Sequence, residues 1–174
     1  MVTIRQANIG ELSDVALFYC DFIASMRGSE FKPDWEMGVY PTEQLLENAI
    51  AEQTLFLAHA DSRLAGAMII NHECEPDYAN AKWQTDSAKD EVMIIHLLGV
   101  APACQGKGVA KEMVASVIEM CAKNSIKAIR LDVLKKNIPA IKLYMSMGFQ
   151  YIDTVNIFYE DTGFADFLLY ELAL

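Results

Sequence analysis

The residues best suited to chemistry form a glycine-bearing turn, Gln105-Gly106-Lys107-Gly108-Val109-Ala110. An apolar stretch typical of a strand, Glu91–Val100, comes before it, and a stretch typical of a helix, Lys111–Lys123, follows it. Glycines let the backbone approach a ligand closely because they have no Cβ. The first amides of a helix have no partner inside the helix, and its dipole adds partial positive charge there. The turn therefore predicts a site for pyrophosphate, to which Lys107 adds a full positive charge.

Hydrophobic periodicity predicts the elements that must position this turn, in the order β-α-α-β-β-β-α-β-α-β-β. The expected strands are Val2–Ala7, Thr54–Ala60, Leu64–Asn71, Glu91–Val100, Ala128–Leu134, Phe149–Tyr159 and Phe164–Leu172. The expected helices are Leu12–Met26, a segment that Thr42 caps and that runs to Glu52, Lys111–Lys123, and a segment from the cap Asn137 to Gly148. Hairpins give antiparallel pairs and helical crossovers give parallel ones, so the order predicts an α/β domain with a mixed sheet.

Composition narrows the class of protein. The 174 residues predict a single domain, 1–174, that is large enough to bury a core. No apolar run approaches the roughly 20 residues of a membrane helix, and the N-terminus lacks the features of a signal peptide. We therefore expect a cytoplasmic protein that does not bind a membrane. The net charge of -10 argues against a nucleic-acid partner, and it is compatible with a cationic substrate or simply with solubility.

The cysteines are scattered and form no C-x-x-C pair: Cys20, Cys74, Cys104 and Cys121. The sequence therefore predicts neither disulfides nor a metal site. His72-Glu73-Cys74 has no matching second cluster of ligands.

Two segments together resemble the GNAT (Gcn5-related N-acetyltransferase) family. Gln105, Gly108 and Ala110 match its Gln/Arg-x-x-Gly-x-Gly/Ala motif, and Asn137–Tyr144 followed by Met147-Gly148-Phe149 resembles its second signature. The first motif alone is weak, but the pair with a strand between them is specific. The resemblance covers essentially the whole chain and implies a GNAT-like α/β fold. That fold has a central mixed, mostly antiparallel twisted sheet of about seven strands, with four helices on its faces.

The resemblance also implies acetyl-CoA as the donor and an amine as the acceptor. It assigns the binding of coenzyme A to Leu98, Gly99, Val100, Gln105, Gly106, Lys107, Gly108, Val109, Ala110, Asn137, Ala140 and Tyr144. Main-chain groups of Leu98 and Val100 are expected to pair with the pantetheine arm like an added strand. Asn137 either contacts that arm, or caps its helix, or does both.

The family pattern makes Tyr144 the acid that protonates the leaving thiolate, with core packing as the alternative. His96 is the candidate general base, with a buried structural role as its alternative. Two-residue alternation predicts that Val92, Ile94, His96, Leu98 and Val100 share one face of their strand. Ile94 stands at a level where some family members carry a carboxylate, which argues against a direct Glu base. Cys104 could form an acyl-cysteine, although the family usually transfers the group directly.

Two irregular segments, Gly28–Pro41 and Cys74–Asp90, match the family least. Trp35, Tyr40, Tyr78 and Trp83 are their candidate substrate-binding residues, and a loop folded onto the core is the alternative. The predicted function is N-acetyl transfer, an acyl transfer other than aminoacyl transfer, to a small-molecule amine. The alternatives are a protein or peptide N-acetyltransferase and a non-catalytic acyl-CoA-binding sensor. The terminal hairpin, Phe149–Leu172, is interpreted either as a homodimer contact or as a cover over the core.

Overall fold

A computed structural model describes residues 2–174 and arranges them as one seven-stranded sheet with helices on both faces. The strands are β1 Val2–Gln6, β2 Leu55–Ala60, β3 Arg63–Asn71, β4 Val92–Val100, β5 Ala128–Leu134, β6 Gln150–Tyr159 and β7 Gly163–Ala173. The α-helices are α1 Leu12–Ser25, α2 Glu43–Ala51, α3 Val109–Lys123 and α4 Ile138–Ser146. Short 3-10 turns are η1 Ile9–Glu11, η2 Pro76–Asn80, η3 Lys89–Glu91 and η4 Pro102–Cys104. In residues 2–174, no helix combines the length and the hydropathy that crossing a membrane requires.

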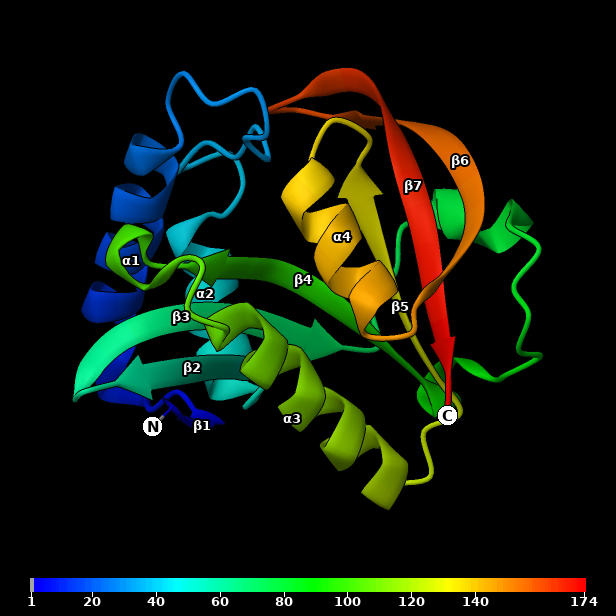
Figure 1. The fold of residues 1–174 in the computed structure, drawn as a ribbon, viewed down its shortest axis with the longest axis horizontal. Coiled ribbons are helices and arrows are strands. Elements are labelled where there is room, and N and C mark those ends of the chain that lie inside the picture. The colour runs from blue at the N-terminus through cyan, green and yellow to red at the C-terminus, as the bar shows by residue number, and fades with distance from the viewer. Residues whose placement is uncertain (1) are drawn as a thin grey trace.

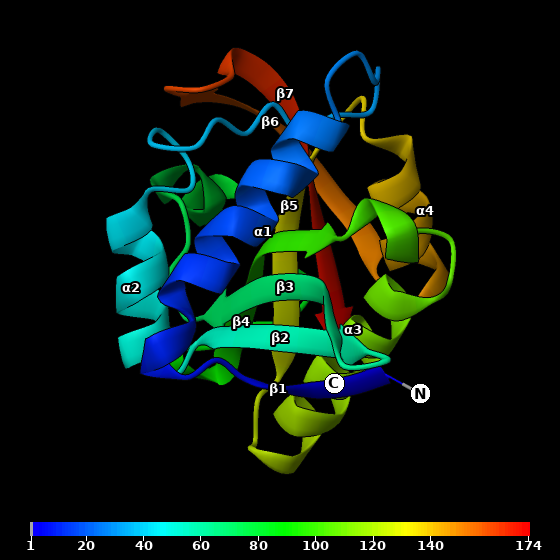
Figure 2. The ribbon, with the colours of Figure 1, turned by 90° about the vertical axis from the view of Figure 1, so that its left-hand side faces the viewer.

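The strand order is β1-β2-β3-β4-β5-β7-β6, and only the β4–β5 pair is parallel. Helices α1 and α2 cover one face of the sheet, and α3 and α4 cover the other (Figures 1 and 2). Tyr19 and Leu46 belong to the core under the first pair of helices, while Met113 and Ile129 belong to the core under the second. The predicted mixed and mostly antiparallel sheet with four helices is therefore confirmed.

Polar side chains cap the first turns of α2 and α4, as the sequence predicts. The Thr42 hydroxyl accepts a hydrogen bond from the Leu45 amide at 3.1 Å, and the Asn137 side chain accepts one from the Ala140 amide at 3.3 Å. Helix α3 begins two residues earlier than expected, at Val109. The reason is Gly108, which adopts a left-handed φ of 85° immediately before the helix and turns the chain into it.

Strands β4 and β5 separate soon after they pair. Their parallel ladder contains three pairs, from Val92 with Ala128 to Ile94 with Arg130. Beyond these pairs β1–β4 run across the view of Figure 1, while β5, β7 and β6 run steeply through it. The sheet therefore opens between the carboxyl-terminal halves of β4 and β5, which is where ligands of open α/β sheets bind.

A β-bulge in β4 accompanies the opening. Ala67 pairs with Gly99 and Ile69 pairs with His96, so β4 contains one residue more than β3 over this interval. Leu97 lies in the bulge with a φ of +52°, and its carbonyl accepts a 2.8 Å hydrogen bond from the buried Tyr19 hydroxyl of α1.

The bulge makes one sequence-based prediction wrong. Strict alternation would place His96 and Leu98 on one face of β4, but the extra residue reverses the phase between them. Leu98 and Val100 pack toward α3 and α4. The His96 ring bonds instead to Asn71 of β3, whose strand neighbour Ile69 packs toward α1 and α2.

Candidate functional site

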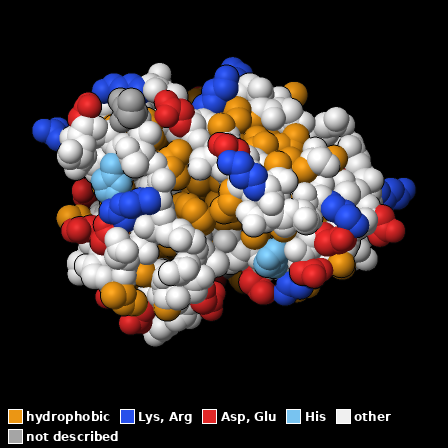
Figure 3. Space-filling model, turned by 90° about the horizontal axis from the view of Figure 1, so that it is seen from below, with side chains coloured by type: hydrophobic (Ala, Val, Ile, Leu, Met, Phe, Trp, Pro, Cys, Tyr) orange, Lys and Arg blue, Asp and Glu red, His pale blue; other side chains and the backbone are white. Residues whose placement is uncertain are grey.

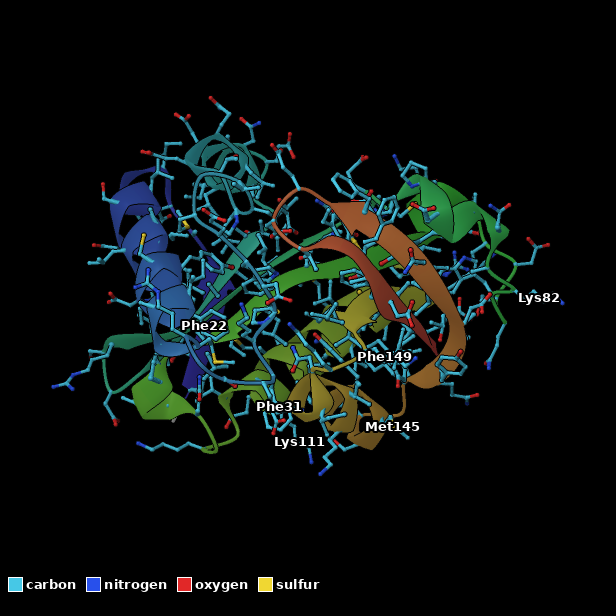
Figure 4. All side chains as sticks on the ribbon, turned by 90° about the horizontal axis from the view of Figure 1, so that it is seen from above. Phe22, Phe31, Lys82, Lys111, Met145 and Phe149 are labelled. Atoms are coloured by element: carbon cyan, nitrogen blue, oxygen red, sulfur yellow. The ribbon has the colours of Figure 1, made fainter. Side chains whose placement is uncertain are left out.

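A cavity of about 700 Å³ occupies the opening between β4 and β5. Its wall is built from both strands, the start of α3, α4, the end of α1 with its following loop, and the β6–β7 turn. Phe22 of α1, Phe31 of the following loop and Lys111 of α3 contribute to it from different elements (Figure 4). Lys82 projects from the opposite end of the molecule in the same view. Segments distant in sequence thus meet around one space.

The predicted pyrophosphate turn forms one part of this wall. Gly106 and Gly108 have φ of 71° and 85°, and a Cβ at either position would meet nothing within 4 Å. The first main-chain bond of α3 runs from the Glu112 amide to the Gly108 carbonyl at 3.0 Å, so the amides from Gly108 to Lys111 precede the helical ladder. The Gln105 and Lys107 amides already donate to the Pro102 and Cys104 carbonyls. Gln105, Val109 and Ala110 also line the cavity. This end of the cavity can hold an anion.

Lysine at this turn is placed differently from the prediction. Lys107 is exposed and does not line the cavity, whereas Lys111, one turn into the helix, does. Residues at the first turn of a helix can point to the same side as the preceding loop, and Lys111 was overlooked because it lies outside the glycine motif.

The edge of β4 forms the next part of the wall. Leu98 and Val100 line the cavity as predicted, and beyond Ile94 this edge has no ladder with β5. Gly99 does not line it, because its α-carbon faces Phe18 and Phe22 of α1, with the nearest ring atom 3.4 Å from a built Cβ. The Val100 carbonyl accepts a hydrogen bond from the Gln105 side chain at 3.2 Å, which ties the turn to the strand.

Helix α4 presents Asn137, Ala140 and Tyr144 to the same cavity. Tyr144 is only 6% exposed and packs edge-on against Phe149, with ring centroids 5.4 Å apart. Within residues 2–174, its hydroxyl makes no hydrogen bond, and it is not sealed in the core, because Ser87 Oγ is the one buried side-chain atom of that range without a partner. Burial, and then the charge of Asp132, raise the pKa of Tyr144, so the phenol is protonated at neutral pH and can donate a proton.

His96 lines the cavity from β4, but its environment is that of a neutral ring. Burial is the largest influence and lowers the pKa of His96 to about 4, partly opposed by a hydrogen bond to the Glu73 carbonyl. Nε2 lies 3.0 Å from the Asn71 Oδ1 and 3.0 Å from the Glu73 carbonyl, and both are acceptors. The proton therefore resides on Nε2, and Nδ1 carries the lone pair.

Three carboxylates that the sequence reasoning missed also line the cavity: Glu75, Asp132 and Asp161. Asp132 of β5 accepts hydrogen bonds from the Tyr78 hydroxyl at 2.8 Å and the Tyr159 hydroxyl at 3.3 Å. Burial is the main cause that raises the pKa of each of the three. The strand segment around Asp132 was noted in the sequence, but its single carboxylate gave no signal of the other two.

The four aromatic residues predicted to bind substrate divide into two pairs. Trp35 and Tyr40 line the cavity, but Tyr78 and Trp83 do not. Tyr78 is buried and bonds to Asp132 from behind, while the Trp83 Nε1 donates to the Tyr78 carbonyl at 2.9 Å. The Cys74–Asp90 segment therefore supports the strands of the site through these two residues. Composition alone could not separate aromatic residues that line the cavity from those that support its wall.

The surface of the described residues carries side chains of both charges. On the face seen from below, Lys and Arg side chains are interspersed with Asp and Glu (Figure 3). No group of three or more His, Cys, Asp or Glu in residues 2–174 is placed to hold one metal ion.

Comparisons with known proteins agree with the fold. The family model described as "Acetyltransferase (GNAT) family" matches residues 21–149. The mycothiol acetyltransferase of Renibacterium salmoninarum is 38% identical over 55 residues, which are 32% of this chain and 16% of that protein. The matched stretch is therefore a minor part of that relative's length.

Solved structures resemble the chain over almost its whole length. A GNAT-family acetyltransferase from Streptococcus agalactiae has a TM-score of 0.82 at 20% identity, covering 99% of this chain and 95% of that one. A GNAT-family acetyltransferase from Listeria monocytogenes has a TM-score of 0.75 at 23% identity, with the same coverage of 99% and 95%. A protein from Salmonella typhimurium, solved with its cofactor acetyl-CoA, has a TM-score of 0.69 at 15% identity, covering 100% and 94%. At these identities the likeness shows the fold.

Proposed function

Since the chain belongs to the GNAT acetyltransferase family, we propose that it transfers an acetyl group from acetyl-CoA to the primary amine of a small molecule by direct attack. The observation that carries the proposal is the continuity of one cavity. The same space reaches from the glycine turn at Gly106 and Gly108 to the unpartnered hydroxyl of Tyr144.

The chain offers groups suited to holding the donor substrate. The amides from Gly108 to Lys111 and the cavity-lining Lys111 side chain suit a pyrophosphate, and the open space beside the two glycines leaves room for it. The β4 edge at Leu98 and Val100 has no β5 partner, which suits an extended amide-bearing arm lying beside it as an added strand. An amide of this edge would also polarise the thioester carbonyl.

Transfer requires one group to accept a proton and another to supply one. The amine nitrogen bonds to the carbonyl carbon as the carbon–sulfur bond breaks, and the amine proton passes to a base. Tyr144 donates its phenolic proton to the leaving thiolate and is then reprotonated from solvent. Its raised pKa suits this role, because the phenol is protonated before the thiolate departs.

Two side chains compete for the role of base. His96 has a free Nδ1 lone pair, but its lowered pKa of about 4 makes the ring a weak base. Asp132 has a raised pKa and lies close enough to Tyr144 for its charge to raise the pKa of that phenol. We therefore assign the base to Asp132, directly or through water, and retain His96 as the second candidate.

Calorimetry with acetyl-CoA tests the donor half of the proposal. We expect binding at micromolar concentrations that Gly108→Trp abolishes, because the indole would fill the space beside the turn and strain its left-handed backbone. Gly10→Trp is the matched control, since Gly10 lies in open space far along the chain and does not line the cavity. Absence of binding by the unmodified protein would overturn the proposal.

Amine-dependent release of the CoA thiol separates an enzyme from a binding-only sensor. We expect a panel of small amines to release the thiol, and Tyr144→Phe to lower turnover by roughly 10²-fold with little effect on acetyl-CoA binding. Binding without release across small amines and peptides would favour the sensor. Release with peptides alone would favour a protein or peptide N-acetyltransferase.

A further inference from the structure

The wall of the cavity carries negative charge that the described protein does not neutralise. Glu75, Asp132 and Asp161 reach it from three segments: the loop before η2, strand β5 and the β6–β7 turn. None of the three has an ion pair within residues 2–174. Glu75 lacks even a side-chain hydrogen bond in that range. Elsewhere, Asp34 pairs with Lys32 and Lys136, and Asp166 pairs with Lys135.

The three carboxylates line the same cavity as one aromatic side chain on which all their charges act. Tyr40 lines the cavity, and the charges of Asp132, Glu75 and Asp161 all contribute to its raised pKa, after burial. Asp132 likewise raises the pKa of Glu75. Glu75 and Asp132 therefore repel each other across a space that Asp161 also lines, and a cation that enters this space would relieve the repulsion.

A second observation points to a ligand in the same space. The Tyr144 side chain is 6% exposed and borders the cavity, and its hydroxyl makes no hydrogen bond to another group of residues 2–174. A phenol hydroxyl that borders a cavity and has no protein partner is free to bind a group that enters this cavity. The charge of Asp132 reaches this hydroxyl, which connects it to the acidic wall.

The carboxylates of the cavity wall are not gathered around one point. No three carboxylates in residues 2–174 are placed around one metal position. Negative charges spread around an aromatic-lined space suit a flexible molecule with separated positive groups. The rings of Trp35, Tyr40 and Tyr159 also line this space, and aromatic faces attract ammonium groups.

We infer that the acceptor is a small di- or oligoamine, whose reacting amine meets Asp132 and Tyr144 while a second, still protonated amine is held by Glu75 and Asp161. This inference rests on the proposed acetyl transfer and names its substrate class. The second ammonium keeps its charge through the reaction, so it positions the molecule without entering the chemistry. A monoamine of equal length would fit but would leave Glu75 and Asp161 unpaired.

Calorimetric titration of the protein saturated with CoA tests this directly. The probes are putrescine, cadaverine and spermidine, with butylamine and pentylamine as singly charged counterparts of matched length. We expect at least one diamine or oligoamine to bind roughly tenfold or more tighter than the monoamines, because a charge-assisted hydrogen bond contributes that much. Glu75→Gln and Asp161→Asn should each reduce this preference by a similar factor. The preference should also weaken as salt is raised.

A matched control is available beside Asp161. Glu160→Gln removes the neighbouring charge, but this side chain is exposed and outside the cavity wall, so the preference should persist. Equal binding of diamines and monoamines, or a preference that survives Glu75→Gln combined with Asp161→Asn, overturns the inference. If butylamine still releases CoA thiol in that case, the proposed acetyl transfer stands. If acetyl-CoA itself fails to bind, it is the proposed function that fails.

Discussion

Two carboxylates, Asp132 on β5 and Glu171 on the neighbouring β7, illustrate two uses of negative charge in this fold. Glu171 of β7 is 1% exposed and pairs across the ladder with Arg130, whose Nε lies 2.7 Å from its Oε2. The Gln84 and Thr85 amides each donate to its Oε1 at 2.9 Å. Asp132, two residues along β5 and on the same face as Arg130, has no cation and accepts only from two phenols.

Glu171 and Asp132 differ in whether a positive side chain neutralises them. Glu171 is satisfied by the protein: Arg130 neutralises it, and the Arg130 guanidinium also lies 4.2 Å from the centroid of the Trp83 ring. This network fixes the Cys74–Asp90 segment against the sheet. Asp132 is left unneutralised and faces a cavity. Compensated charge thus serves the fold, and uncompensated charge is available for chemistry.

Removing the compensated charge of Glu171 should cause the largest loss in the free energy of unfolding. Glu171→Gln would leave Arg130 buried without a counter-charge, and we expect a loss of about 3–5 kcal/mol in the free energy of unfolding. Urea denaturation measures it. Asp166→Asn, on the same strand, is the control, because its exposed pair with Lys135 should contribute little. A Glu171 variant as stable as the control would remove the structural half of the contrast.

Removing the uncompensated charge should affect turnover and not stability. In Asp132→Asn, the amide oxygen can still accept from Tyr78 and Tyr159, but it cannot take a proton from the amine. We expect turnover to fall by roughly 10²–10³-fold, as for loss of a general base. The free energy of unfolding should be unchanged or higher, because burial already disfavours the charged carboxylate. Retained turnover, together with its loss in His96→Gln, would transfer the role of base to His96.

His96 is a third titratable group beside the cavity, and its effect on stability should appear only as the pH falls. Its folded pKa of about 4 lies below the ordinary value near 6.5, so between these values only the unfolded chain binds the proton. Stability conferred by the neutral ring is therefore lost as pH falls through this window. From pH 7 to pH 5, we expect the unmodified protein to lose about 2 kcal/mol more than His96→Gln does. Parallel stability curves for the two proteins would show that the ring is already solvated.

Features set by neighbouring residues could be predicted from the sequence. The Thr42 and Asn137 caps and strand Ala128–Leu134 depend on local hydrogen bonds and periodicity, and the structure confirms all three. The start of α3 at Val109 differs from the expectation by two residues, because the left-handed Gly108 ends the turn earlier.

Features that depend on residues distant in the chain could not be predicted from the sequence. The bulge at Leu97 is held by Tyr19, which lies 78 positions away in the chain, so alternation along β4 gave the wrong face for His96. The acidic wall is assembled from three separated segments, and each carboxylate alone looks like an ordinary solubilising charge. Tyr78 and Trp83 stand in an irregular loop like Trp35 and Tyr40, yet only the fold decides which pair meets the cavity.

The single cavity between β4 and β5 has a consequence for the order of events. The glycine turn, Tyr144 and the acidic wall all border that one space, so both substrates can be present together before any bond changes. Initial-rate lines measured at several fixed amine concentrations should therefore intersect and not run parallel. The separation of β4 from β5 thus predicts a sequential rate equation, in which both substrates bind before either product leaves.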